Sequence, residues 1–449
     1  MLNRLRHPLV AVAVALVLTV PWIGTFVASG GYGTVHPGEN ITPGMAVLVG
    51  GLALVGAAFL LAWGAETAEK DVPQAFAIAV LAVLAVAPEY AVDALYAWQA
   101  GAGSSEAANL AVANMTGANR ILIGLGWSGI AFFTIYLAKR TADPAVEYRS
   151  GFLADVVSLD RDIATEIMFL LVATTYAFFI PLSGGIGPLD TLFLVGLFLL
   201  YIFVAIRGGA GASEEHIGVP AYFHQYPKGP RIAVVLFGFV FSGVVIFTAV
   251  HPFAEGLEQL GLQYGIPKFF MIQWFAPLAS ESPELIVVAY LVNKARSTAG
   301  FNALISSKLN QWTLLIGTLA VVYSISAGAI GTLSFDSKQA AEIWITAAQS
   351  LFAIALLTDF EISIREAVVL LILFTTQVLT EFYVIQTYAG PTATTLSISI
   401  LYAYTVVYAV LSVGLFVKRR ESAHELLEHG VSNVRAAIGI GTGQTERAD

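Results

Sequence analysis

The chain has 449 residues, of which 57% are hydrophobic and only 12% are charged, and it contains no cysteine. This composition, with a mean hydropathy of +0.76, excludes an ordinary soluble domain, and the lack of cysteine excludes disulfide bonds and thiol chemistry. The net charge of −9 says little about partners, because much of the surface is expected to face lipid.

Twelve apolar runs are each long enough to cross a bilayer, since a transmembrane helix needs roughly 20 consecutive apolar residues. We therefore expect an all-α polytopic membrane protein with about twelve transmembrane helices. The fourth and ninth runs exceed the required length, so these helices are expected to be bent or overlong. In chain order the runs cover residues 8–29, 44–65, 72–98, 105–138, 162–182, 189–206, 231–253, 267–292, 300–330, 340–358, 363–386 and 394–417.

The first run, preceded by Arg4 and Arg6, has some features of a signal peptide. Its length of about 22 residues exceeds a usual signal-peptide core, and it lacks a clear cleavage site with small residues. We expect a retained helix.

The distribution of Lys and Arg sets the orientation, because cytoplasmic loops carry the excess of both. If the N-terminus lies inside and the runs alternate, sixteen of these residues fall in inside segments and only Lys268 and Lys338 fall outside. The sequence thus predicts an even number of helices, a multi-pass protein of the cell membrane, and two cytoplasmic termini.

The third and eighth runs carry the same buried acid motif, Pro88-Glu89 and Pro283-Glu284. Each acid lies 16 or 17 residues after a proline that opens its helix, and each is followed 26 to 30 residues later by an asparagine, Asn119 or Asn310. A carboxylate at membrane depth is costly and usually functional. Two at matching positions of a repeat indicate one ion site shared by both halves.

The two motif helices run in opposite directions across the membrane, so the halves form inverted repeats of five helices, with one extra helix at each end. The tail is expected to begin as a short amphipathic helix and to end disordered. The expected divisions are residues 1–43 (N-terminal helix and loop), 44–206 (first half), 207–230 (flexible cytoplasmic linker), 231–386 (second half), 387–420 (C-terminal helix) and 421–449 (cytoplasmic tail).

Helical spacing places further oxygen ligands near the two acids. Asp93 shares a helix face with Glu89, and Glu281 shares one with Glu284. Each motif proline frees a backbone carbonyl one turn earlier, and carboxylates with carbonyls suit a hard cation such as Ca²⁺. Asp93 is also compatible with a solvated outer vestibule, and Glu281 has no acidic counterpart in the first half, where Val86 stands.

Hydroxyl and amide side chains can complete such a site. The amides are those of Asn119 and Asn310, and the candidate hydroxyl groups are those of Ser280, Ser306 and Ser307. Small hydroxyl residues also serve as helix-packing positions in membranes.

Two cations, Arg120 and Lys308, fall deep within apolar runs, and a buried charge needs a partner. One hypothesis is that both pair with the four acids, which would leave a net charge matching one divalent cation. The alternative is that one or both reach a water-filled cavity or the membrane interface.

Motifs of other function classes are missing from the sequence. The seven histidines are scattered without metal-ligand spacing, and no zinc-protease motif, nucleophile elbow or nucleotide-binding loop occurs. We expect neither an enzyme nor an ATP-driven pump, and we expect no cofactor. The expected partners are inorganic cations and the lipid bilayer, without nucleic acid.

The sequence resembles the calcium/cation antiporter superfamily and, within it, the sodium/calcium exchangers. That family has two inverted repeats, each with a Gly-Thr-Ser-x-Pro-Glu signature followed by a helix with a Gly-Ser-Asn-type segment. The corresponding segments here are LAVAPE (84–89), ASESPE (279–284), NMTGAN (114–119) and SSKLN (306–310). The lead-in helices, with Glu66 and Glu255, are also similar.

The resemblance implies roles for individual residues. Glu89 and Glu284 match the central Ca²⁺-binding acids, Asn119 and Asn310 the asparagine or aspartate of the site, and Ser280 and Ser306 its hydroxyl ligands. Repeat one departs from the family, since Ala85 and Val86 replace Thr and Ser. Sodium sites built from these hydroxyl groups would have fewer ligands.

We therefore expect a secondary active antiporter that exchanges Ca²⁺, or a related divalent cation, for Na⁺ or H⁺ by alternating access around a midplane acidic site. The alternative is a cation channel or a cation-binding membrane protein without exchange. A channel would pass Ca²⁺ without dependence on Na⁺ or pH gradients.

Overall fold

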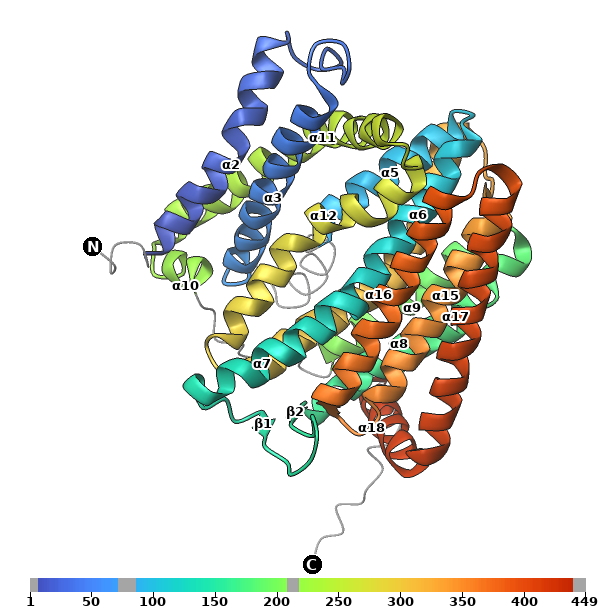
Figure 1. Cartoon of the computed structure of the whole chain (residues 1–449). Helices are drawn as coiled ribbons and strands as arrows, with labels where there is room; N and C mark the ends of the chain where they lie inside the picture. The colour runs from blue at the N-terminus through green and yellow to red at the C-terminus, as the bar shows by residue number, and fades with distance from the viewer. Residues whose placement is uncertain (1–6, 72–85, 208–217, 439–449) are drawn as a thin grey trace, which may run out of the picture.

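The computed structural model describes residues 7–71, 86–207 and 218–438, which form a bundle of long helices (Figure 1). Within these ranges, eleven helical segments are long and apolar enough to span a membrane, and each matches a predicted run. They are α2 (Pro8–Ala28), α3 (Pro43–Ala68), Ser105–Thr141, Arg161–Ser183, α9 (Pro188–Arg207), α11 (Lys228–Tyr264), α12 (Lys268–Val292), Ser297–Ala327, α15 (Ser337–Leu356), α16 (Ile364–Thr387) and α17 (Gly390–Lys418).

The predicted run 72–98 is the one without a full counterpart, because residues 72–85 lie outside the described residues. Its described end is α5 (Ala87–Gly101), which has Pro88 in its first turn. Proline fits there, since a first-turn N–H has no partner within the helix.

The predicted overlong helices are confirmed, with 37 residues in Ser105–Thr141 and 31 in Ser297–Ala327. Each contains a π-helical segment at the corresponding place. In the first half, α6 (Ser105–Ile121) leads into η1 (Leu122–Trp127) and α7 (Ser128–Thr141). In the second, α13 (Ser297–Asn310) leads into η4 (Gln311–Leu315) and α14 (Ile316–Ala327). Both segments begin within three residues of the predicted asparagines, and π-helical turns are common at functional sites.

Sequence signals at the helix ends explain several boundaries. Thr42 caps α3 and Asp336 caps α15, each through a hydrogen bond from a first-turn backbone N–H to its side chain. Ser363 and Glu366 form a reciprocal capping box at the start of α16.

The helices gather into a peripheral group and a central group. In Figure 1, α2, α3 and α11 lie together on one side, whereas α5, α6 and α12 lie in the middle, next to α15, α16 and α17. At the crossing of α6 and α12, a Cβ atom added to Gly117 would lie 1.7 Å from the backbone oxygen of Gln273. Glycine at this position lets the two helices that carry candidate site residues approach closely.

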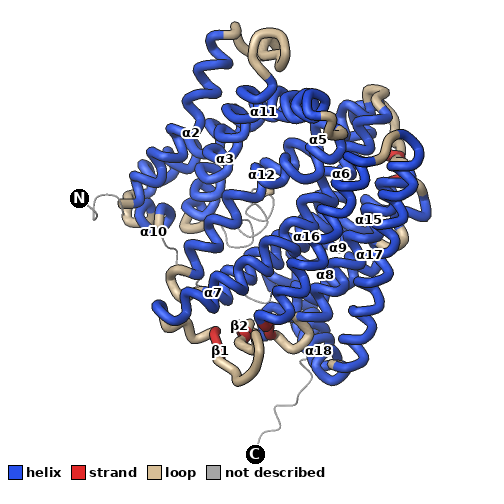
Figure 2. Tube along the Cα trace, viewed as in Figure 1, coloured by secondary structure: helices blue, strands red, loops and turns tan. Residues whose placement is uncertain are grey.

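Two small antiparallel sheets join loops from the two halves (Figure 2). One sheet contains β1 (Val146–Glu147), β2 (Val156–Ser158) and β5 (Glu361–Ser363), and Val157 pairs with Ile362. The other pairs β3 (Gly185–Ile186) with β4 (Leu333–Ser334). In each sheet, the strands come from loops that the Lys and Arg distribution assigns to the same side of the membrane.

The linker and the tail carry two further helices. The described part of the linker contains α10 (Val219–Phe223), while the predicted flexible stretch around residues 208–217 lies outside the described residues. The tail forms α18 (Arg420–Ile438), longer than expected. It packs on α8 (Ala164–Ala177), where Asn433 donates a hydrogen bond to Thr165.

Candidate cation site

The four predicted acids lie on two helices, one from each half of the chain. Glu89 and Asp93 project from the first turns of α5, and Glu281 and Glu284 flank Pro283 within α12. Glu89, Asp93 and Glu281 are buried, and Glu284 is half-buried. The repeat motif therefore brings its acids into the protein interior.

Glu89 and Glu281 form the contact between the halves. Their carboxyl groups lie within hydrogen-bonding reach of each other, and Ser280 Oγ donates to Glu89 Oε2 at 3.2 Å. Glu89 Oε1 is buried and has no hydrogen-bond partner among the described residues. Two carboxyl groups can hydrogen-bond to each other only when one of them is protonated.

The two acids of α12 are each held by the helix that follows. Gln311 Nε2 donates to Glu281 Oε1 at 2.6 Å, and Ser307 Oγ donates to Glu284 Oε2 at 2.7 Å. Glu284 Oε1 is buried and has no partner within the described part of the chain. The second half thus presents a carboxylate oxygen with free coordination capacity.

Asp93 is bound inside the protein rather than solvated. Asn114 Nδ2 donates to Asp93 Oδ1 at 2.9 Å, and only 1% of the Asp93 surface is exposed. Sequence reasoning singled out neither Asn114 nor Gln311. The one feature of the sequence that marks them is that each is an amide within or directly after a segment that resembles the family.

The carbonyl freed by Pro283 is that of Ala279, and it accepts a hydrogen bond of 3.0 Å from Ser282 Oγ. A carbonyl oxygen has two lone pairs, so this bond leaves one for a cation. The corresponding carbonyl in the first half, at residue 84, lies outside the described residues.

The two predicted asparagines have different surroundings. Asn310 Oδ1 accepts a hydrogen bond of 3.3 Å from the Tyr90 hydroxyl on α5, next to Glu89. Asn119 Oδ1 accepts one of 2.6 Å from Lys308 Nζ, and its Nδ2 donates to the Met115 carbonyl at 2.8 Å. The structure therefore places Asn310 beside the acid helix and Asn119 against a buried cation.

Ser306 lies away from the acids. Its side chain lies close to Tyr201, whose hydroxyl donates to Glu166 at 3.2 Å, whereas the neighbouring Ser307 donates to Glu284. Adjacent helix residues point about 100° apart, so they cannot both face α12. The hydroxyl next to the acid is that of Ser307.

The hypothesis that Arg120 pairs with the site acids is wrong. Arg120 Nη1 forms an ion pair of 2.9 Å with Glu342 on α15, and the guanidinium also donates to Gln349 and Gln377. Lys338 bridges Glu342 and Glu381 at 2.9 and 2.7 Å. These two cations and two acids form a buried network without net charge, in which each ion has a partner of opposite charge.

Lys308 is the buried cation that stays near the acids. It is 0% exposed and forms no ion pair within 4.0 Å among the described residues. Its Nζ lies 4.4 Å from the centre of the Trp312 ring, and Glu281 is the acid that attracts it electrostatically. Lys308 thus places a buried amino group beside the site.

The cluster offers the oxygen ligands that a hard cation prefers, but it is not a closed cage. In the described ranges, no group of three or more acidic or histidine side chains is arranged to hold a metal ion. Ca²⁺ takes six to eight oxygens, so its binding here requires hydroxyl and carbonyl groups as well as carboxylates.

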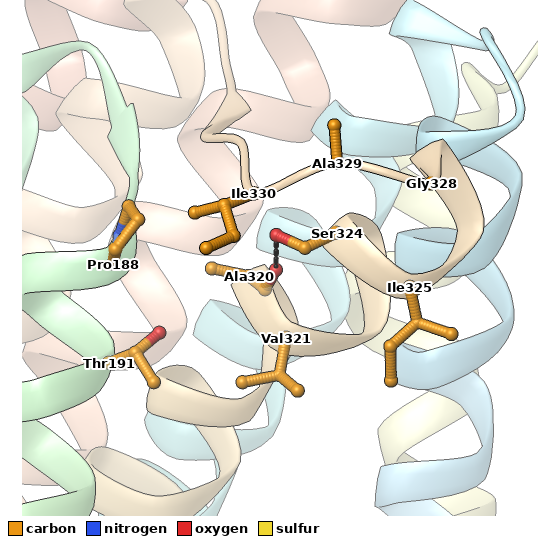
Figure 3. A pocket seen from close by; sticks show the side chains of 9 residues that line it. All are labelled: Pro188, Thr191, Ala320, Val321, Ser324, Ile325, Gly328, Ala329 and Ile330. Atoms are coloured by element: carbon orange, nitrogen blue, oxygen red, sulfur yellow. Dashed lines mark hydrogen bonds between the residues drawn. The ribbon is translucent and has the colours of Figure 1, made fainter.

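A separate surface hollow of about 470 Å³ lies between α9 and α14 (Figure 3). None of its lining residues, which include Pro188, Thr191 and Ile330, is titratable. Ser324 Oγ, also in the lining, donates to the carbonyl of Ala320 at 2.6 Å. This hollow is distinct from the acid cluster.

Comparisons with known proteins agree with the arrangement. The family described as "Sodium/calcium exchanger protein" matches residues 43–207 and 234–383. The crystal structure of the H⁺/Ca²⁺ exchanger CAX is similar, with 40% sequence identity and a TM-score of 0.82 over 97% of this chain and 99% of that one. The structure of native YfkE shares the fold at 16% identity and a TM-score of 0.54, over 83% of this chain and 98% of that one. Among curated proteins, the sequence finds no match.

Proposed function

Because the chain belongs to the sodium/calcium exchanger protein family, we propose that it is a secondary active antiporter of the cell membrane that exchanges Ca²⁺, or a related divalent cation, for protons. The observation that carries the proposal is the buried contact between the carboxyl groups of Glu89 and Glu281, one from each half of the chain. Loss of its proton leaves two carboxylates facing each other, which a divalent cation can bridge.

Several site residues then take defined roles. Glu89 and Glu284 bind the divalent cation, with Glu281, Ser280 and Ser307 as supporting oxygens. Asp93, Asn119 and Asn310 shape the site. We propose neither a resident cofactor nor a catalytic residue.

Protons are favoured over Na⁺ as the coupling ion for two reasons. A hydrogen bond between the carboxyl groups of Glu89 and Glu281 requires a proton, so proton release and cation uptake would act on the same oxygens. The similar structure with 40% identity is also that of an H⁺/Ca²⁺ exchanger.

Alternating access is proposed to occur by sliding of α3 and α11 against the central helices. These two helices pack closely on each other, and small residues such as Gly238 and Gly64 lie in their contact. At one end, Arg231 forms an ion pair of 2.6 Å with Asp71. This ion pair joins the turn after α3 of the first half to α11 of the second half, so that the two helices are proposed to move together.

The orientation follows the distribution of Lys and Arg, with both termini in the cytoplasm. The divisions at residues 44–206 and 231–386 are proposed as the two repeat halves, joined by the cytoplasmic linker.

The test is Ca²⁺ flux in proteoliposomes with a pH gradient and a Na⁺ gradient imposed separately. We expect a pH gradient alone to drive Ca²⁺ against its own gradient. Flux driven by a Na⁺ gradient alone would show that Na⁺, and not H⁺, is the coupling ion. Flux that only follows the Ca²⁺ gradient, whatever the other gradients, would identify a channel.

A further inference from the structure

Lys308 has an unusual position for a residue of a cation site. Its amino group is fully buried, and Lys308 lies two residues before Asn310 and directly after Ser307, which contacts Glu284. A lysine at such depth needs a strong partner, yet within the described residues no carboxylate lies within ion-pair distance of it. Its closest contact is the amide oxygen of Asn119, at 2.6 Å.

Both ends of the Asn119 side chain have partners in this arrangement. Its Oδ1 accepts from Lys308 Nζ, and its Nδ2 donates to the backbone carbonyl of Met115 at 2.8 Å. Lys308 Nζ also lies 3.5 Å from the Asn119 carbonyl, at the end of α6 that leads into the π-helical segment. Two oxygens of one residue and the face of Trp312 therefore surround the ammonium group.

Oxygens of an amide and of a backbone carbonyl, with an aromatic face opposite, form a site suited to a monovalent cation. The ammonium group carries the same single charge as Na⁺ and satisfies the same oxygens. Arg120 does not share this role, because its guanidinium pairs with Glu342, Gln349 and Gln377 instead.

We propose that Lys308 is a tethered substitute for a monovalent cation and thereby determines the coupling specificity of the exchanger. Its ammonium group occupies the oxygens of Asn119, so that Na⁺ has neither ligands nor a favourable potential there. Ca²⁺ and protons then compete only at Glu89, Glu281 and Glu284. This inference deepens the proposed function and rests on it for the identity of the transported ion.

The test compares Na⁺ competition in the wild type and in Lys308→Met, which keeps the length of the side chain but removes its charge. Ca²⁺ binding to purified protein is titrated calorimetrically with and without Na⁺, and flux is measured in proteoliposomes. In the wild type we expect no effect of Na⁺ on the apparent Kd for Ca²⁺. In Lys308→Met we expect Na⁺ to shift it by roughly tenfold, within the range usual for coupled sites.

Two further variants separate charge removal from a general disturbance. Arg120→Met combined with Glu342→Gln removes another buried ion pair and should leave Ca²⁺ binding insensitive to Na⁺. Asn119→Ala in the Lys308→Met background should abolish the acquired Na⁺ effect, because it removes the vacated ligand.

The outcomes distinguish the inference from the proposed function. If Na⁺ has no effect on Ca²⁺ binding by Lys308→Met, the proposed role of Lys308 is wrong. The antiporter function still stands in that case if a pH gradient drives Ca²⁺ flux in the wild type. If the variant does not fold, the wild type decides, because Na⁺ competition in the presence of Lys308 contradicts the inference. A wild type without pH-driven flux overturns the proposed function instead.

Discussion

The hydroxyl group of Ser280 on α12 donates a hydrogen bond of 3.2 Å to the Glu89 carboxylate on α5. These residues lie 191 positions apart and belong to opposite halves of the chain. The second half thus orients the acid of the first half, and a change at either helix alters the same set of oxygens.

Glu89→Gln and Glu284→Gln are each expected to reduce Ca²⁺ flux by about 100-fold or more, since an amide can neither release a proton nor carry the charge that binds Ca²⁺. Flux in proteoliposomes and size-exclusion profiles measure transport and folding together. Glu166→Gln is the matched control, because this half-buried acid accepts a hydrogen bond from Tyr201 and lies outside the cluster. Near-normal transport by Glu89→Gln or Glu284→Gln would refute the site.

Ser307→Ala and Ser306→Ala form a pair of adjacent substitutions with opposite expectations. Ser307 donates to Glu284, and the loss of a hydrogen bond to a charged group costs about 1.5–3 kcal/mol. We expect Ser307→Ala to weaken Ca²⁺ binding by roughly tenfold or more. Ser306→Ala should bind Ca²⁺ as the wild type does, because Ser306 contacts Tyr201. Calorimetric titration of both variants checks this, and equal effects would contradict the assignment.

Arg120→Met is expected to destabilise the protein by about 3–5 kcal/mol, because it disturbs a buried network and leaves Glu342 with a single cationic partner. The combined substitution Arg120→Met and Glu342→Gln should recover part of this loss. The measurement is a double-mutant cycle of unfolding free energies in detergent. Strictly additive effects would show that the two residues do not interact.

The ion pair between Arg231 and Asp71 predicts a pH dependence of stability. The hydrogen bond from Arg231 holds the pKa of Asp71 below its usual value of 3.8. Since the folded pKa is lowered, the stabilisation is present above pH 3.8 and is lost as the pH falls through the folded value. Thermal unfolding between pH 3 and 6 should therefore show a smaller acid-induced loss of stability in Asp71→Asn than in the wild type. Identical pH profiles would exclude a contribution from this pair.

The repeat pattern identified Glu89 and Glu284 because a carboxylate in an apolar run is rare and two at matching positions are rarer still. The same pattern could not find Gln311 or Asn114 as partners of Glu281 and Asp93. Amides are common at helix surfaces, and a single sequence does not say which face of a helix meets which neighbour. Ser306 and Ser307 are adjacent on one helix and face different neighbours, so a shift of one position decides which serine contacts Glu284.

The sequence by itself predicted the eleven spans that the described residues form and singled out the repeated Pro-Glu motif, since bilayer thickness and the cost of buried charge act on local composition. Only the tertiary structure decided the partners of the two buried cations. Arg120 meets Glu342, 222 positions away, and Lys308 meets Asn119, 189 positions away. Neither pairing has a local signal, because it depends on which helices pack side by side and on how each is rotated about its axis.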